Sequence, residues 1–181
     1  MVIALAGRRT DASDAEVARF PLAQNEVVRE RLHDLFVDRG ATALVCSGAC
    51  GADLLALDVA GRLGLQRRMV LASDRAQFRS NSVTDRPGDW GPLFDRIADA
   101  LARTGNLVVS EQAQEAANPY AATNSAILSE ALELARNAQP HRGMLAVAVW
   151  EGAARGEGDM TAHFLRSAQQ RGLETATILT R

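Results

Sequence analysis

Two glycine-rich stretches each follow an apolar run and carry residue types suited to binding an anion. The first is SGACGAD, which follows the run ALV at residues 43–45. Small residues before a helix leave backbone N–H groups open, and a helix N-terminus favours negative charge. Gly48 and Gly51 remove side chains where a ligand would approach, whereas Asp53 either caps the helix or touches the ligand. The ligand-binding residues expected here are Ser47, Gly48, Ala49, Gly51, Ala52 and Asp53.

The second stretch, WEGAARGEGDMT, starts at Trp150 and has three glycines within seven residues. An acidic residue and a threonine at the mouth of the next helix suit a second phosphate or ribose site; the alternative is a flexible loop with an aspartate cap. The chain has no Gly-Lys-Ser/Thr sequence and no lysine, which disfavours an ATPase or kinase. The residues expected to bind are Trp150, Gly152, Arg155, Gly156, Gly158, Asp159 and Thr161.

A basic turn follows the first apolar run. Gly7 permits a tight turn, and Arg8 or Arg9 would close over a phosphate unless the loop is simply solvated. Asn124 and, four residues before it, Tyr120 lie near the start of a predicted helix. Asn124 either faces the cleft formed by these turns or lies on the helix surface.

Three carboxylates are the candidates for catalysis, namely Glu111, Glu157 and Asp159. The three histidines show no metal-ligand spacing, so no metal is expected, and no cofactor either. Cys46 and Cys50 are interpreted as small buried residues rather than a redox pair.

These residues are positioned by predicted strands, which are short apolar runs, and by predicted helices, whose apolar residues recur at helical spacing. The predicted strands cover residues 2–6, 42–46, 67–72, 107–110, 144–150 and 175–179, and the predicted helices cover residues 24–39, 52–63, 93–103, 121–137 and 161–170. Residues 73–92 are predicted to be a loop-rich region. Nearly continuous apolar strands favour a parallel sheet covered on both faces. We therefore predict one α/β domain over residues 1–181, with a Rossmann-like, doubly wound, mostly parallel sheet and helices on both faces.

The composition restricts the partners. A formal charge of −2, with all 20 basic residues arginine, gives no broad basic footprint, so DNA binding is not expected. No apolar stretch is long enough to cross a bilayer and the N-terminus has no basic leader, so we expect a cytoplasmic protein that does not bind membranes. The helical faces leave room for a homo-oligomer, such as a homodimer, which the sequence does not assign.

The order of the three turns resembles that of the SLOG superfamily. That group includes LOG-type phosphoribohydrolases, DNA-processing proteins and nucleotide-sensing domains of bacterial conflict systems, so a bacterial source is expected. GRR resembles the short basic element after the first strand of those proteins. SGACGAD is similar to the Ser-Gly-Gly-Ala-x-Gly-x-Asp turn of DNA-processing members, and AVWEGAARGEGDMTAHF resembles a phosphate-binding turn and its helix in nucleotide-sensing members.

The resemblance implies a Rossmann-like sheet and a small-molecule ligand derived from a nucleotide. The first hypothesis is a module that binds and senses a nucleoside phosphate or an ADP-ribose relative. The alternative is a LOG-type hydrolase or transferase that acts on the N-glycosidic bond of a nucleotide. LOG-type enzymes have a catalytic Glu three residues after the threonine of their glycine-rich motif, where this chain has Phe164 after Thr161. A third alternative is an oligomerising or DNA-binding partner protein.

Overall fold

A single sheet of six parallel strands forms the centre of the molecule. The computed structural model describes residues 1–181, and its strands occur in the order β4-β3-β2-β1-β5-β6, with every neighbouring pair parallel. The strands are β1 (Val2–Gly7), β2 (Ala43–Cys46), β3 (Gln66–Leu71), β4 (Leu107–Val109), β5 (Met144–Trp150) and β6 (Glu174–Leu179).

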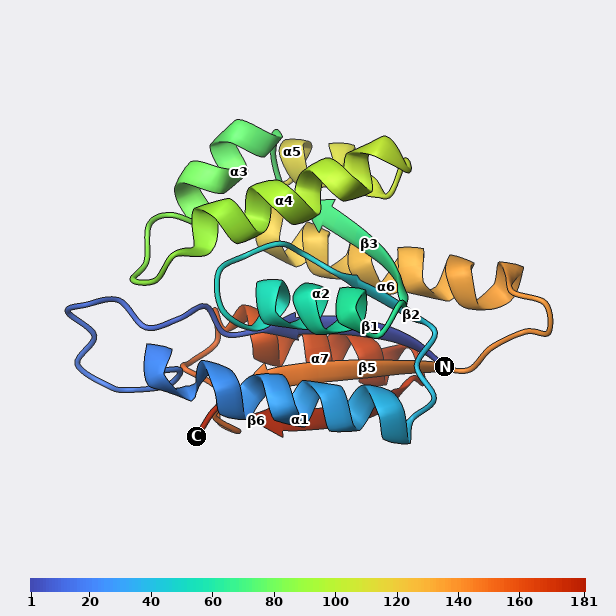
Figure 1. The fold of residues 1–181 in the computed structure, drawn as a ribbon, viewed down its shortest axis with the longest axis horizontal. Helices are drawn as coiled ribbons and strands as arrows, with labels where there is room; N and C mark the ends of the chain where they lie inside the picture. The colour runs from blue at the N-terminus through green and yellow to red at the C-terminus, as the bar shows by residue number, and fades with distance from the viewer.

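Helices cover both faces of this sheet. Helices α1, α2 and α4 pack on one face, and α6 and α7 pack on the other (Figure 1). The predicted fold class, a doubly wound Rossmann-like α/β fold, is therefore confirmed. The helices are η1 (Leu22–Gln24), α1 (Asn25–Asp38), α2 (Ala52–Arg62), α3 (Arg75–Ser82), α4 (Trp90–Arg103), α5 (Glu111–Glu115), α6 (Pro119–Asn137) and α7 (Met160–Gln170).

The strands are apolar on both sides because each of their faces meets a helical layer. In β1, Ile3 and Leu5 belong to the core beneath α1, α2 and α4, whereas Val2 and Ala4 belong to the core beneath α6 and α7. Successive strand residues point to opposite faces, so one strand contributes to both cores. The two layers are thereby tied to the same backbone.

Two short helices differ from the sequence prediction. Helix α3 lies inside the region that we predicted to be loop-rich, and α5 precedes the expected start of α6. The side chain of Asp74 caps α3 by accepting hydrogen bonds from the backbone N–H groups of Ala76 and Gln77, and Ser110 caps α5. Phe78 is the only large apolar residue of α3, so the segment has almost no helical hydrophobic pattern.

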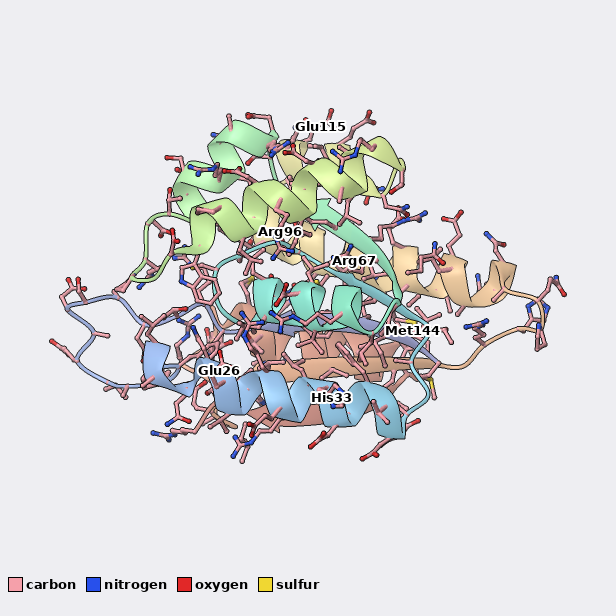
Figure 2. All side chains as sticks on the ribbon, in the orientation of Figure 1. Glu26, His33, Arg67, Arg96, Glu115 and Met144 are labelled. Carbon is pink, nitrogen blue, oxygen red and sulfur yellow. The ribbon has the colours of Figure 1, made fainter.

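Charged residues join the helices of the first layer. Asp58 on α2 pairs with Arg29 on α1 at 2.6 Å and with Arg96 on α4 at 3.2 Å. Figure 2 shows Arg96 between α4 and α2, with Arg67 of β3 nearby, and His33 on α1. Cys46 and Cys50 are buried and unbonded to each other, as the sequence indicated, and burial raises the pKa of both thiols. None of the helices combines the length and the apolar character that a membrane crossing requires.

Candidate ligand-binding site

The main cavity lies where the chain direction across the sheet changes. Strands β1 and β5 are neighbours, but the chain leaves β1 toward β2 on one side and leaves β5 toward β6 on the other. The loops after these strands therefore diverge and leave a crevice at the carboxyl ends, which is the usual ligand position in such sheets. The long loop after β1 extends from the same end of the sheet as the C-terminus (Figure 1).

This crevice contains a cavity of about 500 Å³. Its walls come from the loops after β1, β2, β3 and β5, from α3, from the N-terminal half of α6 and from the first turn of α7. The volume lies within the usual range for small-molecule sites, roughly 300–1,000 Å³. Apolar side chains, among them Phe78, Ile127 and Met160, line it together with the arginines described below.

The structure brings together many, but not all, of the residues predicted from the sequence. Those that line the cavity are Gly7, Arg8, Arg9, Ser47, Ala49, Asp53, Asn124, Arg155 and Thr161. Those that lie outside its lining are Gly48, Gly51, Ala52, Trp150, Gly152, Gly156, Gly158 and Asp159.

The glycines of the turn after β2 accommodate protein atoms rather than a ligand. A Cβ on Gly48 would lie 2.8 Å from the sulfur of Met69 and 3.2 Å from the ring of Phe94. A Cβ on Gly51, whose φ is +92°, would lie 2.7 Å from the backbone nitrogen of Thr10. This corrects the reason that the sequence suggested for both glycines: they let the core and the β1 loop approach the start of α2.

Arg8 is the centre of a buried ion-pair cluster. Its Nε donates to Glu151 at 2.6 Å, its Nη1 donates to Asp159 at 2.8 Å, and its Nη2 donates to the carbonyl of Ala153 at 3.0 Å. The guanidinium also lies 5.6 Å from the ring centroid of Trp150. With its donors already engaged inside the protein, Arg8 has little capacity to close over a phosphate as the sequence suggested.

Asp159 fills the N-terminus of α7. Its carboxylate accepts hydrogen bonds from the backbone N–H groups of Arg155, Thr161 and Ala162 and from Arg8. Burial alone would raise the pKa of Asp159, but the bonds from Arg8 and from those N–H groups hold it well below its ordinary value. The group remains ionised, and its charge occupies the position where a ligand anion would otherwise meet the helix.

Asp53 is in a different environment at the start of α2. Its side chain is buried, with 5% of the residue exposed, and one oxygen accepts the N–H of Ala49 at 3.4 Å. Burial raises the pKa of Asp53 to about 7, against a smaller lowering by the hydrogen bond from the backbone N–H of Ala49. Its other oxygen, Oδ1, is buried without a hydrogen-bond partner. The helix cap itself is Gly51, which uses no side chain, so Asp53 is not the cap.

Three arginines at the cavity differ in how far they are engaged. Arg9 pairs with both carboxylate oxygens of Asp85, at 2.9 and 2.7 Å. Arg155 reaches Asp159 through Nε at 3.3 Å, and Arg86 approaches Asp85 only to 3.6 Å. The terminal nitrogens of Arg86 and Arg155 therefore remain free to bind an anion.

Helix α6 supplies another part of the cavity wall. The Nδ2 of Asn124 donates to the carbonyl of Met160 at 2.8 Å, which joins α6 to α7. Tyr120 lies one turn earlier, lines the cavity and is 53% exposed. Its ring is available for stacking.

Some cavity residues were not predicted from the sequence. Arg86 and Phe78 come from the region that we interpreted as loop-rich, and Thr10 comes from the β1 loop, which approaches α2 only in the folded chain. No local pattern marks them, because their positions depend on tertiary contacts.

The three candidate catalytic carboxylates lie away from the cavity lining or are already engaged. Glu111 is exposed in the first turn of α5, and Glu157 is exposed in the loop after β5. Asp159 belongs to the Arg8 cluster. The structure contains no group of three or more His, Cys, Asp or Glu residues that could hold a metal ion.

No protein-family model and no curated protein matches this chain. Among solved structures, the chain is similar to the X-ray structure of DNA processing protein A (DprA) from Streptococcus pneumoniae, with 15% identity and a TM-score of 0.36. The match covers 97% of this chain and 58% of that chain, so the present chain spans little more than half of its length. At this identity and TM-score, the likeness carries no inference about activity.

Proposed function

We propose that the chain binds a phosphorylated nucleotide derivative, such as a nucleoside phosphate or an ADP-ribose relative, in the cavity at the carboxyl ends of the strands. The observation that carries this proposal is the cavity itself, which lies where β1 and β5 diverge and has free guanidinium nitrogens at its wall. Arginine matches the oxygens of a phosphate through paired N–H donors. The resemblance of the turns to those of SLOG proteins supports the same ligand class.

Separate parts of the wall suit the separate parts of such a ligand. Arg86 and Arg155 would bind the phosphate, and the exposed ring of Tyr120 would stack on the base. The site proposed here differs from the one expected from the sequence, because the carboxylates of Asp53 and Asp159 occupy the starts of α2 and α7. The phosphate is therefore assigned to arginine side chains rather than to helix N-termini.

Thermal denaturation tests the proposal, with nucleoside mono-, di- and triphosphates, cyclic nucleotides, NAD and ADP-ribose as ligands and adenosine as the phosphate-free control. A ligand at about 100 times its Kd adds roughly 2.7 kcal/mol. For a chain of this size, that gain raises the Tm by about 5–10 °C. The rise should shrink in the double variant Arg86→Gln/Arg155→Gln and persist in Arg103→Gln, which changes an exposed arginine at the end of α4. No rise with any phosphorylated ligand would refute the proposal.

Hydrolysis of the N-glycosidic bond is the alternative, and it requires a carboxylate beside the ribose. Glu111 and Glu157 lie outside the cavity lining, and Asp159 is held in an ion-pair cluster. We therefore propose binding without cleavage. Release of free base from a bound nucleotide by the purified protein would contradict that choice.

A further inference from the structure

Two buried polar atoms at the cavity have no hydrogen-bond partner within the protein. They are Oδ1 of Asp53 and Oγ1 of Thr10, from residues that are 5% and 1% exposed. Both residues line the cavity of the proposed ligand. Native proteins rarely leave buried polar atoms unpaired, and a site that binds a ligand is one place where such atoms occur.

Both residues lie in the region where the β1 loop packs against the start of α2. The backbone of Thr10 is so close to Gly51 that a Cβ there would lie 2.7 Å from its nitrogen, and Asp53 is two residues further along the helix. The backbone N–H of Ala52, next to Asp53, also donates to the carbonyl of Arg8 in the β1 loop at 3.0 Å. Thr10 and Asp53 are therefore fixed to one junction of the backbone.

The chemistry of these atoms selects a hydroxyl-bearing group. A carboxylate oxygen accepts hydrogen bonds and repels phosphate, whereas a threonine hydroxyl both donates and accepts. The other oxygen of Asp53 already accepts the N–H of Ala49, so one oxygen is left for the ligand. One free acceptor and one free hydroxyl in the lining of the same cavity suit the hydroxyls of a ribose better than the paired N–H groups of a guanine edge.

We propose that Asp53 and Thr10 bind the ribose hydroxyls of the ligand, so that the cavity selects ribonucleotides over deoxyribonucleotides. This inference rests on the proposed function, since it concerns the sugar of the same ligand. In this arrangement Arg86 and Arg155, which line the same cavity, hold the phosphate.

Isothermal titration calorimetry tests the selectivity directly. The probes are the 5′-mono- and diphosphates of the four ribonucleosides, each compared with its 2′-deoxy and 3′-deoxy counterpart, together with ADP-ribose. Loss of a hydroxyl would leave Asp53 unpaired in a buried site, which should weaken binding about tenfold or more. Equal affinity for ribose and deoxyribose probes would overturn the inference and leave the proposed function standing. Absence of binding by every probe would instead refute the proposed function.

Two variants separate recognition from a structural effect. Asp53→Asn keeps the shape and an acceptor for the N–H of Ala49, so the ratio of ribose to deoxyribose affinity should fall toward one while deoxyribose probes bind as before or more tightly. Thr10→Val removes only the hydroxyl and should lower the same ratio, which provides a second test if Asp53→Asn does not fold. Asp38→Asn, which removes an exposed charge at the end of α1, should leave the ratio unchanged. An unchanged ratio in both cavity variants would overturn the inference.

Discussion

Asp53 on α2 and Asp159 before α7 both lie near the start of a helix, but their surroundings shift their pKa values in opposite directions. The pKa of Asp53 is raised and that of Asp159 is lowered. Asp159 has the guanidinium of Arg8 and several backbone N–H groups within hydrogen-bond distance, so its pKa is held well below the ordinary value. Asp53 has few donors for its buried carboxyl, and burial dominates its pKa. At the scale of single residues, the carboxyl of Asp159 stabilises the fold, whereas the carboxyl of Asp53 has an oxygen without a partner in the protein.

The raised pKa of Asp53 predicts a stability that falls as the pH rises. Its pKa moves from 3.8 to about 7 on folding, so the folded protein holds a proton between these values that the unfolded chain has lost. Each pKa unit corresponds to about 1.4 kcal/mol of stability, lost progressively between about pH 4 and pH 7. Urea unfolding across this range should therefore show a decline in the wild type that is absent in Asp53→Asn.

Four other carboxyls affect the stability of the fold in a different, more acidic pH range. The pKa values of Asp58, Asp95, Glu151 and Asp159 are lowered, so the stability that they contribute is lost only as the pH falls below their ordinary values near 4. The control Asp38→Asn should keep the wild-type slope between pH 5 and pH 7. Parallel curves for wild type and Asp53→Asn would show that Asp53 does not titrate in this range.

At the scale of elements, the Arg8 cluster fastens the start of the β1 loop to the loop between β5 and α7. Glu151 and Asp159 lie more than 140 residues from Arg8 in the sequence and yet share its guanidinium, and Arg19 of the β1 loop also pairs with Glu151. Both loops contribute to the cavity wall. The cluster therefore joins two segments that form the cavity wall.

Two adjacent arginines allow a matched test of this role. Replacement of Arg8 by Met should cost up to about 3–5 kcal/mol, because Glu151 and Asp159, with side chains only 2% and 0% exposed, would lose their buried cation. Glu151 would keep only Arg19, and Asp159 only Arg155 and its backbone N–H donors. Arg9→Met removes a partly exposed pair with Asp85 and should cost less than about 1 kcal/mol. Urea denaturation at pH 7 measures both values. Similar losses in the two variants would mean that the cluster has no special role.

The elements also show what the sequence could and could not predict. The strand Met144–Trp150 was predicted with correct bounds because an unbroken apolar run between polar segments admits one interpretation. Helix α3 was missed because its pattern is polar and its cap acts through Asp74. The two glycines of the β2 turn were recognised as sites of close approach, but the approaching atoms are those of Met69, Phe94 and Thr10, whose proximity only the folded chain reveals.

At the scale of the whole molecule, the two helical layers share every central strand. The core beneath α1, α2 and α4 and the core beneath α6 and α7 both include residues of β1, β2, β3 and β5. Neither layer has a sheet of its own to pack against if the other unfolds. The single domain expected from the sequence thus predicts one cooperative unfolding transition.

The two tryptophans allow this prediction to be tested from separate parts of the molecule. Trp90 lies in the core at the start of α4, and Trp150 ends β5 beside the Arg8 cluster. In Trp150→Phe, fluorescence reports on α4 alone, and in Trp90→Phe it reports on the end of β5. For each variant, the fluorescence midpoint in urea should coincide with the circular-dichroism midpoint, and the calorimetric and van't Hoff enthalpies should agree. A fluorescence transition from Trp90 that precedes the loss of helical signal would instead show that the segment around α3 and α4 unfolds independently of the sheet.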